Sequence, residues 1–224
     1  MLSFFKKYKF FGTSLLVLSI IIIAIIYNIL DVKKPLPIYQ PASVNAELVD
    51  STIQYQKKYH HIADFSLTNQ NGKTITQNDY TNKIYVADFF FTTCQTICPI
   101  MTKNMYEIQR QFITDNEVMI LSHSVTPKID TVAQLKRYAK EKGVDSRKWN
   151  LVTGDKKEIY ELARKSYMAV KDSGDGGSFD MIHTENFMLI DKKRQIRGYY
   201  DGTNLEDIER LIADIKTLKA SYNN

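Results

Sequence analysis

The clearest pattern in the chain is a long apolar run near its amino terminus. No charged residue occurs from Phe10 to Leu30, and residues 15–26 are almost wholly aliphatic. At a rise of about 1.5 Å per residue, a helix over this run is roughly 30 Å long, the thickness of a bilayer core. A buried core helix is usually shorter and amphipathic. The pattern therefore predicts one transmembrane helix over residues 10–30.

The flanking residues distinguish an anchor from a cleaved signal peptide. Three lysines within residues 1–9 would suit a signal peptide, but the apolar run is too long for one, and residues 27–31 lack the small residues of a cleavage site. No cysteine follows, which argues against a lipoprotein anchor. These lysines and the terminal amine outnumber Lys33 and Lys34, so residues 1–9 are expected to form a cytoplasmic tail. Without an Arg-rich transit peptide, we expect a single-pass protein of the bacterial inner membrane with its soluble domain on the periplasmic side.

Beyond the anchor, residues 31–58 are expected to form a linker, because three prolines near its start favour extended backbone. Residues 59–224 are then expected to form the working domain. Its first signal is a hairpin. Residues 65–68 and 74–76 alternate apolar and polar side chains around Asn71-Gly72, a sequence typical of a tight turn.

The rest of this domain alternates strand and helix patterns. Dense β-branched and aromatic runs predict strands over residues 83–91, 118–125, 150–152, 186–190 and 195–200. Apolar residues at helical spacing predict helices that open at Pro99, run over 132–143, follow Asp155 and run over 205–218. This order predicts an α/β thioredoxin-like sandwich with a leading β-hairpin. Other α/β orders with a mixed sheet are compatible with the same pattern.

Composition and charge narrow the function classes. The chain has 224 residues, 30 Lys and Arg against 25 Asp and Glu, and a net charge of +5. Without the three lysines of the tail the balance is 27 against 25, and the domain has no basic stripe, which argues against nucleic acid as a partner. Only two cysteines are present, which excludes a disulfide-stapled scaffold and a four-cysteine zinc or iron–sulfur site within one subunit.

Those two cysteines, Cys94 and Cys98, lie between the first long predicted strand and its helix. A residue before proline disfavours helical geometry, so Cys98 is expected to end the loop and Pro99 to open the helix. Both sulfurs then lie near a helix amino terminus, where the dipole favours the thiolate. The pair could form a structural disulfide, exchange disulfides or hold a metal ion. A disulfide across so short a loop stabilises little, and thioredoxin motifs have two intervening residues rather than three.

Metal capture requires at least one further ligand, and the chain has four histidines. His183 is favoured, because it follows the glycine-rich residues 172–178 and precedes a strand whose start can face the cysteine loop. For His60 and His61, a solvated position at the linker junction is favoured over a second, weaker metal site. His123 is expected to be structural. Two thiolates and one imidazole suit Cu(I), Cu(II) could add a water or a carboxylate, and zinc would require a fourth ligand.

The motifs resemble the Sco/SenC family, membrane-anchored thioredoxin-like copper proteins that help to assemble cytochrome c oxidase. The likeness covers roughly residues 60–220 and rests on residues 64–73, which include Asn71-Gly72-Lys73, and on residues 88–99, which contain both cysteines. The resemblance implies that Cys94 and Cys98 are thiolate ligands and His183 the imidazole ligand of one copper ion per chain, as Cu(I), Cu(II) or both.

The chain departs from the family pattern at two acidic positions. The family histidine directly follows an aspartate, whereas here Ile182 precedes the histidine and the nearest preceding acid is Asp180. After the second strand of the alternating core, Thr126 stands where the family has an acid close to the metal, while Asp130 matches the pattern. An accessory role for a carboxylate at position 126 is therefore in doubt.

The resemblance implies a metallochaperone that carries copper to the binuclear copper site of cytochrome c oxidase, or reduces the cysteines of that site. Its expected partners are the copper-receiving oxidase subunit, a thiol reductant or other copper carrier, and the membrane through the amino-terminal helix. The alternative is an enzyme with no copper role, a thiol–disulfide reductase or a peroxide-scavenging relative. Reductase activity would require the redox-active pair Cys94 and Cys98 but not His183. A contact-only assembly scaffold is the third, least favoured, reading.

Overall fold

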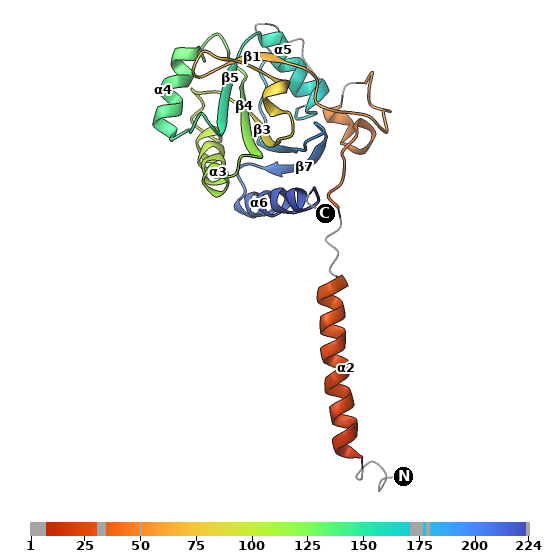
Figure 1. Ribbon diagram of the computed structural model, residues 1–224. Coiled ribbons are helices and arrows are strands. Elements are labelled where there is room, and N and C mark those ends of the chain that lie inside the picture. Colours follow the sequence, from red (N-terminus) through yellow and green to blue (C-terminus); the bar gives the residue numbers. More distant parts are fainter. Residues whose placement is uncertain (1–7, 31–34, 50, 171–176, 178–179, 223–224) are drawn as a thin grey trace. The chain divides into compact units, whose positions relative to one another are not determined.

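The computed structural model describes residues 8–30, 35–49, 51–170, 177 and 180–222 and divides the chain into two compact units, Met1–Pro35 and Leu36–Asn224 (Figure 1). The first unit contains helix α2 (Lys9–Leu30). The second contains, in chain order, η1 (Pro41–Ser43), η2 (Ala46–Leu48), β1 (Ser66–Asn69), β2 (Thr74–Thr76), η3 (Gln77–Tyr80), β3 (Ile84–Phe90), α3 (Cys98–Gln111), β4 (Val118–Ser124), α4 (Val132–Lys142), β5 (Trp149–Thr153), α5 (Lys156–Glu161), η4 (Leu162–Ser166), β6 (Asn186–Ile190), β7 (Ile196–Asp201) and α6 (Leu205–Ala220).

Helix α2 matches the predicted apolar helix to within one residue at its start. It is long and apolar enough to cross a membrane. Two of its polar side chains form hydrogen bonds within the helix. The Thr13 hydroxyl donates to the carbonyls of Lys9 and Phe10 at 3.0 and 2.9 Å, and the Ser19 hydroxyl donates to that of Leu15 at 2.9 Å. Such internal bonding is what a hydrocarbon environment requires.

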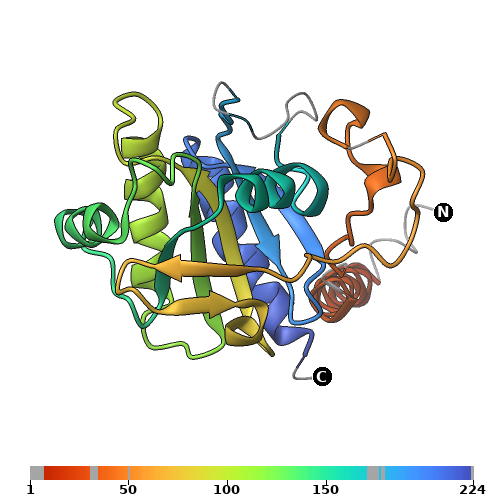
Figure 2. The same ribbon diagram turned by 90° about the horizontal axis from the view of Figure 1, so that it is seen from above.

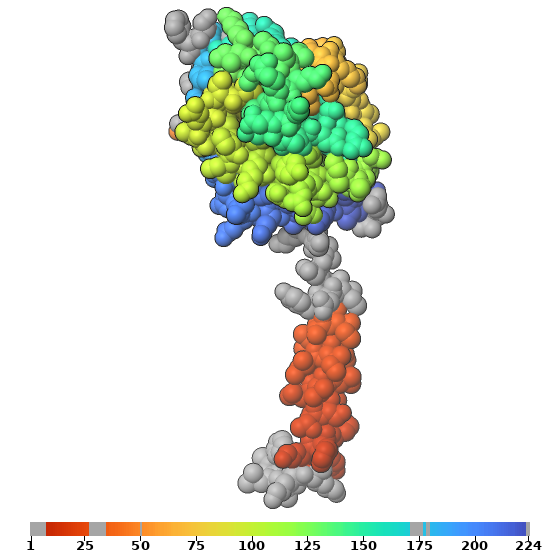
Figure 3. All heavy atoms as spheres, turned by 90° about the vertical axis from the view of Figure 1, so that its left-hand side faces the viewer, coloured from red at the N-terminus to blue at the C-terminus, as the bar shows by residue number. Residues whose placement is uncertain are grey.

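The second unit is built on one seven-stranded mixed sheet with the order β2-β1-β5-β4-β3-β6-β7 (Figure 2). The three central strands β3, β4 and β5 run parallel, and the other pairings are antiparallel. Helices cover both faces. Apolar residues of α3, α4 and α6 form one buried cluster, and those of α5 and η4 form the other. Figure 3 shows α3 and α4 across one face of this unit.

Strand β3 is the central buried strand that its sequence predicts, since all seven of its residues are buried. Its side chains alternate between the two faces, as a strand requires. Ile84, Val86 and Phe90 belong to the cluster beneath α3, whereas Tyr85 and Phe89 belong to the cluster beneath α5. Because β3 ends at the cysteine loop, this packing holds the start of the loop on both sides.

Local turn and cap signals are confirmed. Strands β1 and β2 pair as the predicted hairpin, and Gly72 has the positive φ of +75° that its turn requires. The Asp155 side chain accepts the amide of Glu158 at the start of α5. Gly143 ends α4 with a φ of +71°, a left-handed conformation that favours glycine.

The predicted start of the first core helix is wrong by one residue, because α3 begins at Cys98 rather than Pro99. The preceding Ile97 already has helical angles, φ −83° and ψ −36°, and its carbonyl accepts the amide of Met101 at 3.0 Å. Proline is tolerated at this second position, because amides of the first turn need no acceptor within the helix. Cys98 therefore presents its backbone amide from the first turn.

Residues 36–39 of the expected linker pack against β7 within the second unit. The Arg197 guanidinium donates to the carbonyls of Leu36 and Pro37 at 2.5 and 2.9 Å, and the amide of Tyr39 donates to the carbonyl of Ile196 at 2.9 Å. The Tyr39 ring also meets that of Tyr199 edge-on, with 5.2 Å between centroids. These contacts join the proline-rich segment to the edge of the sheet.

Candidate metal centre at the cysteine loop

The cysteine loop joins the end of β3 to α3 and brings the two sulfur-bearing residues together. The Cys98 backbone amide donates to Cys94 Sγ at 3.5 Å, and the Thr96 hydroxyl lies 3.6 Å from the same sulfur. Cys94 is partly exposed, Cys98 is buried, and no disulfide joins them. Because α3 begins at Cys98, the backbone amide of this residue lies in the first turn and donates to the partly exposed Cys94 sulfur.

The two thiols differ strongly in acidity. Burial raises the pKa of Cys94, but hydrogen bonds from Cys98 and Thr96 outweigh it and lower that pKa to about 7. Burial raises the pKa of the Cys98 thiol to about 12, and the adjacent Cys94 and Asp88 add to the increase. Cys94 is therefore the sulfur that ionises near neutral pH, and it is also the sulfur that solvent reaches.

His183 lies beside the start of this loop. In the antiparallel pairing of β6 with β3, Ala87 is opposite Met188, and His183 lies three residues before β6 begins. The imidazole meets the Phe91 ring edge-on, with centroids 5.6 Å apart and an angle of 80° between the rings. The side chain is exposed. The sheet register thus brings the histidine to the loop that carries the cysteines.

The side chains of Cys94, Cys98 and His183 do not surround a common point in the structure. Within the described part of the chain, no group of three or more His, Cys, Asp or Glu side chains is arranged to hold a metal ion. Cys94 and Cys98 are in contact, whereas the contact of His183 near the loop is with the Phe91 ring. The donor chemistry nevertheless fits a soft ion, because two sulfurs and one imidazole are ligands that copper accepts at low coordination number.

Asp130, which matches the family pattern, organises the loops around the site. It is fully buried, and its carboxylate accepts the Thr92 hydroxyl at 2.5 Å and amide at 3.2 Å. The same carboxylate accepts the hydroxyls of Ser124 at 2.6 Å and Thr126 at 3.0 Å. The threonine in place of the family acid is therefore a hydrogen-bond donor to Asp130. A carboxylate at that position would face another carboxylate.

Replacing Thr126 by valine is expected to lower the free energy of unfolding by about 1–2 kcal/mol, because the variant keeps the shape but loses a hydrogen bond to a buried charged group. Urea unfolding of the variant and the parent chain measures the difference. Thr93→Val is the matched control, since Thr93 is exposed in the cysteine loop. Equal effects of the two substitutions would show that Thr126 does not support Asp130.

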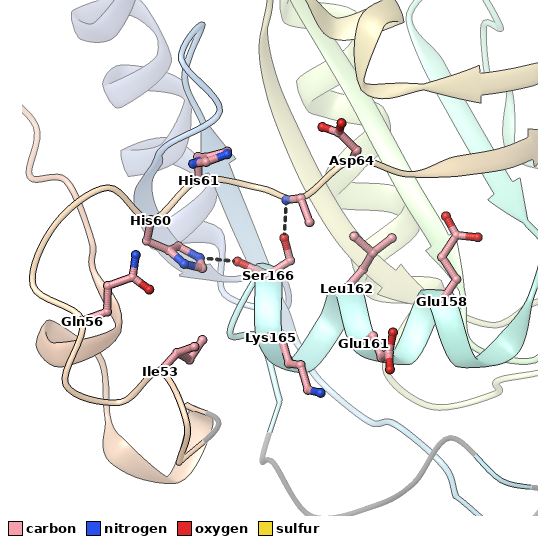
Figure 4. A pocket seen from close by; sticks show the side chains of 11 residues that line it. Ile53, Gln56, His60, His61, Asp64, Glu158, Glu161, Leu162, Lys165 and Ser166 are labelled. Atoms are coloured by element: carbon pink, nitrogen blue, oxygen red, sulfur yellow. Dashed lines mark hydrogen bonds between the residues drawn. The ribbon is translucent and has the colours of Figure 1, made fainter.

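The structure contradicts the expectation that His60 is solvated. Its side chain is buried, and its Nε2 atom lies 2.7 Å from the carbonyl oxygen of Ser166, as the dashed line in Figure 4 shows. Burial lowers the pKa of His60. This contact links residues far apart in the sequence, so no local pattern signals it. His61 is exposed, with Nδ1 3.1 Å from the carbonyl oxygen of Tyr59.

A pocket of about 360 Å³ lies beside these histidines and not at the cysteine loop (Figure 4). Ile53 and Leu162 give it apolar walls, and Asp64, Glu158 and Glu161 contribute carboxylates. The Glu158 carboxylate has a structural hydrogen bond, because it accepts the backbone amide of Ser66 at 2.8 Å.

His123, which was expected to be structural, lies in the core. It is fully buried, and its ring stacks on that of Phe89 with 4.8 Å between centroids. Its Nδ1 atom lies 3.2 Å from the carbonyl oxygen of Asp88. Burial lowers the pKa of His123 to about 4, so the ring is neutral at physiological pH.

Asp88 is a buried carboxyl group that opens the motif of residues 88–99 but to which the sequence assigns no role. The Ser122 hydroxyl donates to it and in turn accepts the Trp149 indole at 2.8 Å. Burial raises the pKa of Asp88 to about 7, although the hydrogen bond from Ser122 opposes this. The available signal is a single acidic residue within a strand whose other residues are all apolar.

Comparisons with known proteins agree with this architecture. The SCO1/SenC family model matches residues 53–220. A SCO1 protein homolog of Bacillus subtilis is 32% identical over 160 residues, which cover 70% of this chain and 82% of the relative. Among solved structures, that of BsSco, a Sco-family cytochrome c oxidase assembly protein with a disulfide switch, is similar at 31% identity and a TM-score of 0.62, covering 72% of this chain and 94% of that one.

A copper-bound structure is also similar. Bradyrhizobium japonicum ScoI with copper bound shares 28% identity and a TM-score of 0.57, with 71% of this chain and 99% of that chain covered. The family match spans every strand of the mixed sheet, and the solved structures confirm the predicted thioredoxin-like sandwich. On the fold and on the extent of the family match, the chain belongs to the SCO1/SenC family.

Proposed function

We propose that this protein is a copper metallochaperone that delivers copper to, or reduces the cysteines of, the binuclear copper site of cytochrome c oxidase. One observation carries the proposal. Cys94 and Cys98 form a free dithiol at a helix amino terminus, and the pKa of the exposed sulfur is lowered to about 7. Support comes from the family, which includes oxidase assembly proteins and a copper-bound member.

In this proposal, one copper ion per chain is the cargo, bound by Cys94, Cys98 and His183. Cys94 would meet the ion first, because it is partly exposed and its thiol ionises near neutral pH. Cys98 would lose its proton as its sulfur binds, and the imidazole of His183 would be the third ligand. A receiving site takes the ion by exchange of thiolate ligands.

Oxidation of the pair would end copper binding, because a disulfide offers no thiolate. The balanced reaction is thiol–disulfide exchange. The two thiols of Cys94 and Cys98 pass two electrons and two protons to a partner disulfide, which becomes a dithiol as the disulfide of this chain forms. The same step describes reduction of the partner's copper-site cysteines, so both branches of the proposal depend on the same two sulfurs.

We also propose the chain's location. Helix α2 anchors the protein in the bacterial inner membrane as a single pass, with residues 1–9 in the cytoplasm and the soluble domain in the periplasm. The length and apolar character of α2 support an anchor. The lysines that precede the apolar run support this orientation. Residues 31–58 then connect the membrane to a copper-binding domain over residues 59–224.

The second candidate function is thiol–disulfide reductase activity without an obligatory role for copper. The contrast between the two cysteines favours it, because one sulfur is exposed with a lowered pKa and the other is buried with a raised one. An exposed attacking thiolate and a buried resolving thiol are what exchange chemistry requires. His183 has no part in this alternative.

Copper retention by the full-length chain in detergent micelles distinguishes these functions. Loaded with Cu(I) and then exposed to a competing chelator, the reduced protein is expected to keep one copper per chain, and the fully oxidised protein none. Metal analysis after gel filtration measures both. The Cys94→Ser/Cys98→Ser double variant is the control for adventitious binding. If the reduced protein retains no more copper than that variant, the metallochaperone proposal is wrong and reductase activity is the better account.

A further inference from the structure

Three side chains on one face of α5 and η4 point toward the segment that leads to His183. Lys156, Tyr160 and Arg164 are spaced four residues apart, so they lie along a single helical stripe. We call these three residues the anchoring stripe. All three contact Asp180, and one also contacts Gly177.

The contact between Arg164 and Asp180 is a buried, two-pronged ion pair. Arg164 Nη1 lies 2.7 Å from Asp180 Oδ2, and Arg164 Nη2 donates to Asp180 Oδ1 at 2.7 Å. The two side chains are only 7% and 8% exposed. A parallel pair of hydrogen bonds fixes orientation as well as distance. Asp180 is therefore held on the helix and is not directed toward the cysteine loop as a ligand.

The other two residues of the anchoring stripe hold the backbone of the same segment. Lys156 Nζ donates to the carbonyls of Gly177 and Asp180 at 2.5 and 2.6 Å. The Tyr160 hydroxyl lies 3.1 Å from the Asp180 carbonyl and 3.0 Å from that of Val125. The Lys156 and Arg164 cations also lie over the Tyr160 ring, at 4.7 and 5.4 Å from its centroid.

The chain is held on the far side of His183 as well. The Thr184 hydroxyl donates to the carbonyl of Ala169 at 3.0 Å, and the side-chain amide of Asn186 donates to the same carbonyl at 3.3 Å. Ile182 and Thr184 are buried, whereas His183 between them is exposed. The histidine thus projects from a short segment that has fixed points on both sides.

We propose that the anchoring stripe consists of positioning residues, which set the place of His183 at the cysteine loop by holding Asp180. This inference rests on the proposed copper function. It assigns a role to Asp180, which lies three residues before His183, whereas the acid of the family pattern directly precedes the histidine. A ligand held in place before the metal arrives loses less conformational freedom on binding, so releasing the segment weakens binding without removing any ligand.

Lys156→Met tests this inference in the full-length chain. The variant removes two backbone contacts and creates no unpaired buried charge. Cu(I) affinity, measured by competition with a chromophoric chelator, is expected to fall about 10-fold, the lower end of the usual effect of losing outer-shell support. Lys157→Met is the matched control, because Lys157 is exposed at the next position of the same helix. It is expected to leave the affinity unchanged.

A second variant separates positioning from folding. Arg164→Met/Asp180→Leu removes both charges of the buried pair, so neither is left unpaired. We expect this double variant to unfold at a urea concentration near that of the parent but to bind Cu(I) about 10-fold more weakly. With Cu(II), its electron paramagnetic resonance spectrum is expected to show weaker nitrogen coupling, which a merely structural role would not change. In the metal-free protein, the His183 imidazole resonances are expected to broaden.

His183→Ala, measured in parallel, distinguishes the two levels of the proposal. If His183→Ala weakens copper binding but the Lys156 and Arg164/Asp180 variants bind like the parent, the positioning role is wrong and the ligand assignment stands. If His183→Ala binds copper like the parent, the ligand assignment is wrong, and the positioning inference fails with it. Equal weakening by Lys156→Met and Lys157→Met would also overturn the positioning role.

Discussion

Asp88→Asn is expected to raise the free energy of unfolding of the reduced, copper-free protein at pH 8 by up to about 4 kcal/mol. The carboxyl group lies in the central strand on the face that packs against α3, and it is only 4% exposed. Its pKa is raised by burial from the usual 3.8 to about 7. At about 1.4 kcal/mol per pH unit, that difference corresponds to about 4 kcal/mol.

The sign of this effect follows from proton linkage. Because the folded carboxyl binds its proton more tightly than the unfolded one, the folded state loses stability as pH rises from about 4 to about 7. Below pH 4 the group is protonated in both states, and above pH 7 the whole penalty is present. Asparagine removes the penalty and keeps an oxygen that can accept the Ser122 hydroxyl.

Urea unfolding at pH 4, 5.5 and 8, followed through the single tryptophan, measures the effect. The gain from Asp88→Asn should be small at pH 4 and largest at pH 8. Asp191→Asn is the matched control, because Asp191 is also buried but pairs with Arg197 at 3.0 Å. Its loss should destabilise the fold. A gain that is the same at all three pH values would contradict a charge effect at Asp88.

Asp88 lies close enough to the cysteine pair to influence the Cys98 thiol. After burial and the influence of Cys94, Asp88 is a further cause of the raised pKa of Cys98. A charged Asp88 therefore bears on both the stability of the core and the acidity of the buried thiol.

His183→Ala is expected to weaken Cu(I) binding by about 100-fold or more. Loss of outer-shell support alone costs about 10- to 100-fold, and removal of a direct ligand should exceed that range. The imidazole is exposed and touches the loop through Phe91, so its removal should leave the fold intact. Competition with a chelator measures the affinity, and urea unfolding checks the stability.

His61→Ala is the control for loss of an exposed imidazole away from the cysteine loop, and it should bind copper like the parent. Rates of disulfide reduction provide the complementary readout. If copper transfer is the function, His183→Ala should lose copper affinity while keeping its dithiol reactivity. Unchanged copper affinity in His183→Ala would remove the histidine from the ligand set and favour the reductase.

Short-range patterns predicted most of the fold. The hairpin around Asn71-Gly72 and the cap at Asp155 depend on neighbours within a few residues, so the sequence carries them directly. The start of α3 was wrong by one residue, because the backbone of Ile97 extends the helical conformation into the loop. That difference matters chemically, since it places the Cys98 amide on Cys94 Sγ.

The site required distant segments to be placed together. The cysteine spacing and the family likeness pointed to Cys94, Cys98 and His183, but only the pairing of β6 with β3 brings the histidine beside the loop. The position of His60 was wrong for the same reason, because its Nε2 contacts a carbonyl 106 residues away in the chain.

By itself, the sequence determined the apolar helix, the alternation of strands and helices, and the pair of cysteines to which the proposal assigns copper. These properties depend on side-chain periodicity and on the chemistry of single residues. The tertiary structure alone decided which buried groups meet, namely Asp88 with Ser122 and Asp180 with Arg164. Such pairs depend on sheet register and on helix packing, because a buried polar group requires a hydrogen-bond partner that no local pattern encodes.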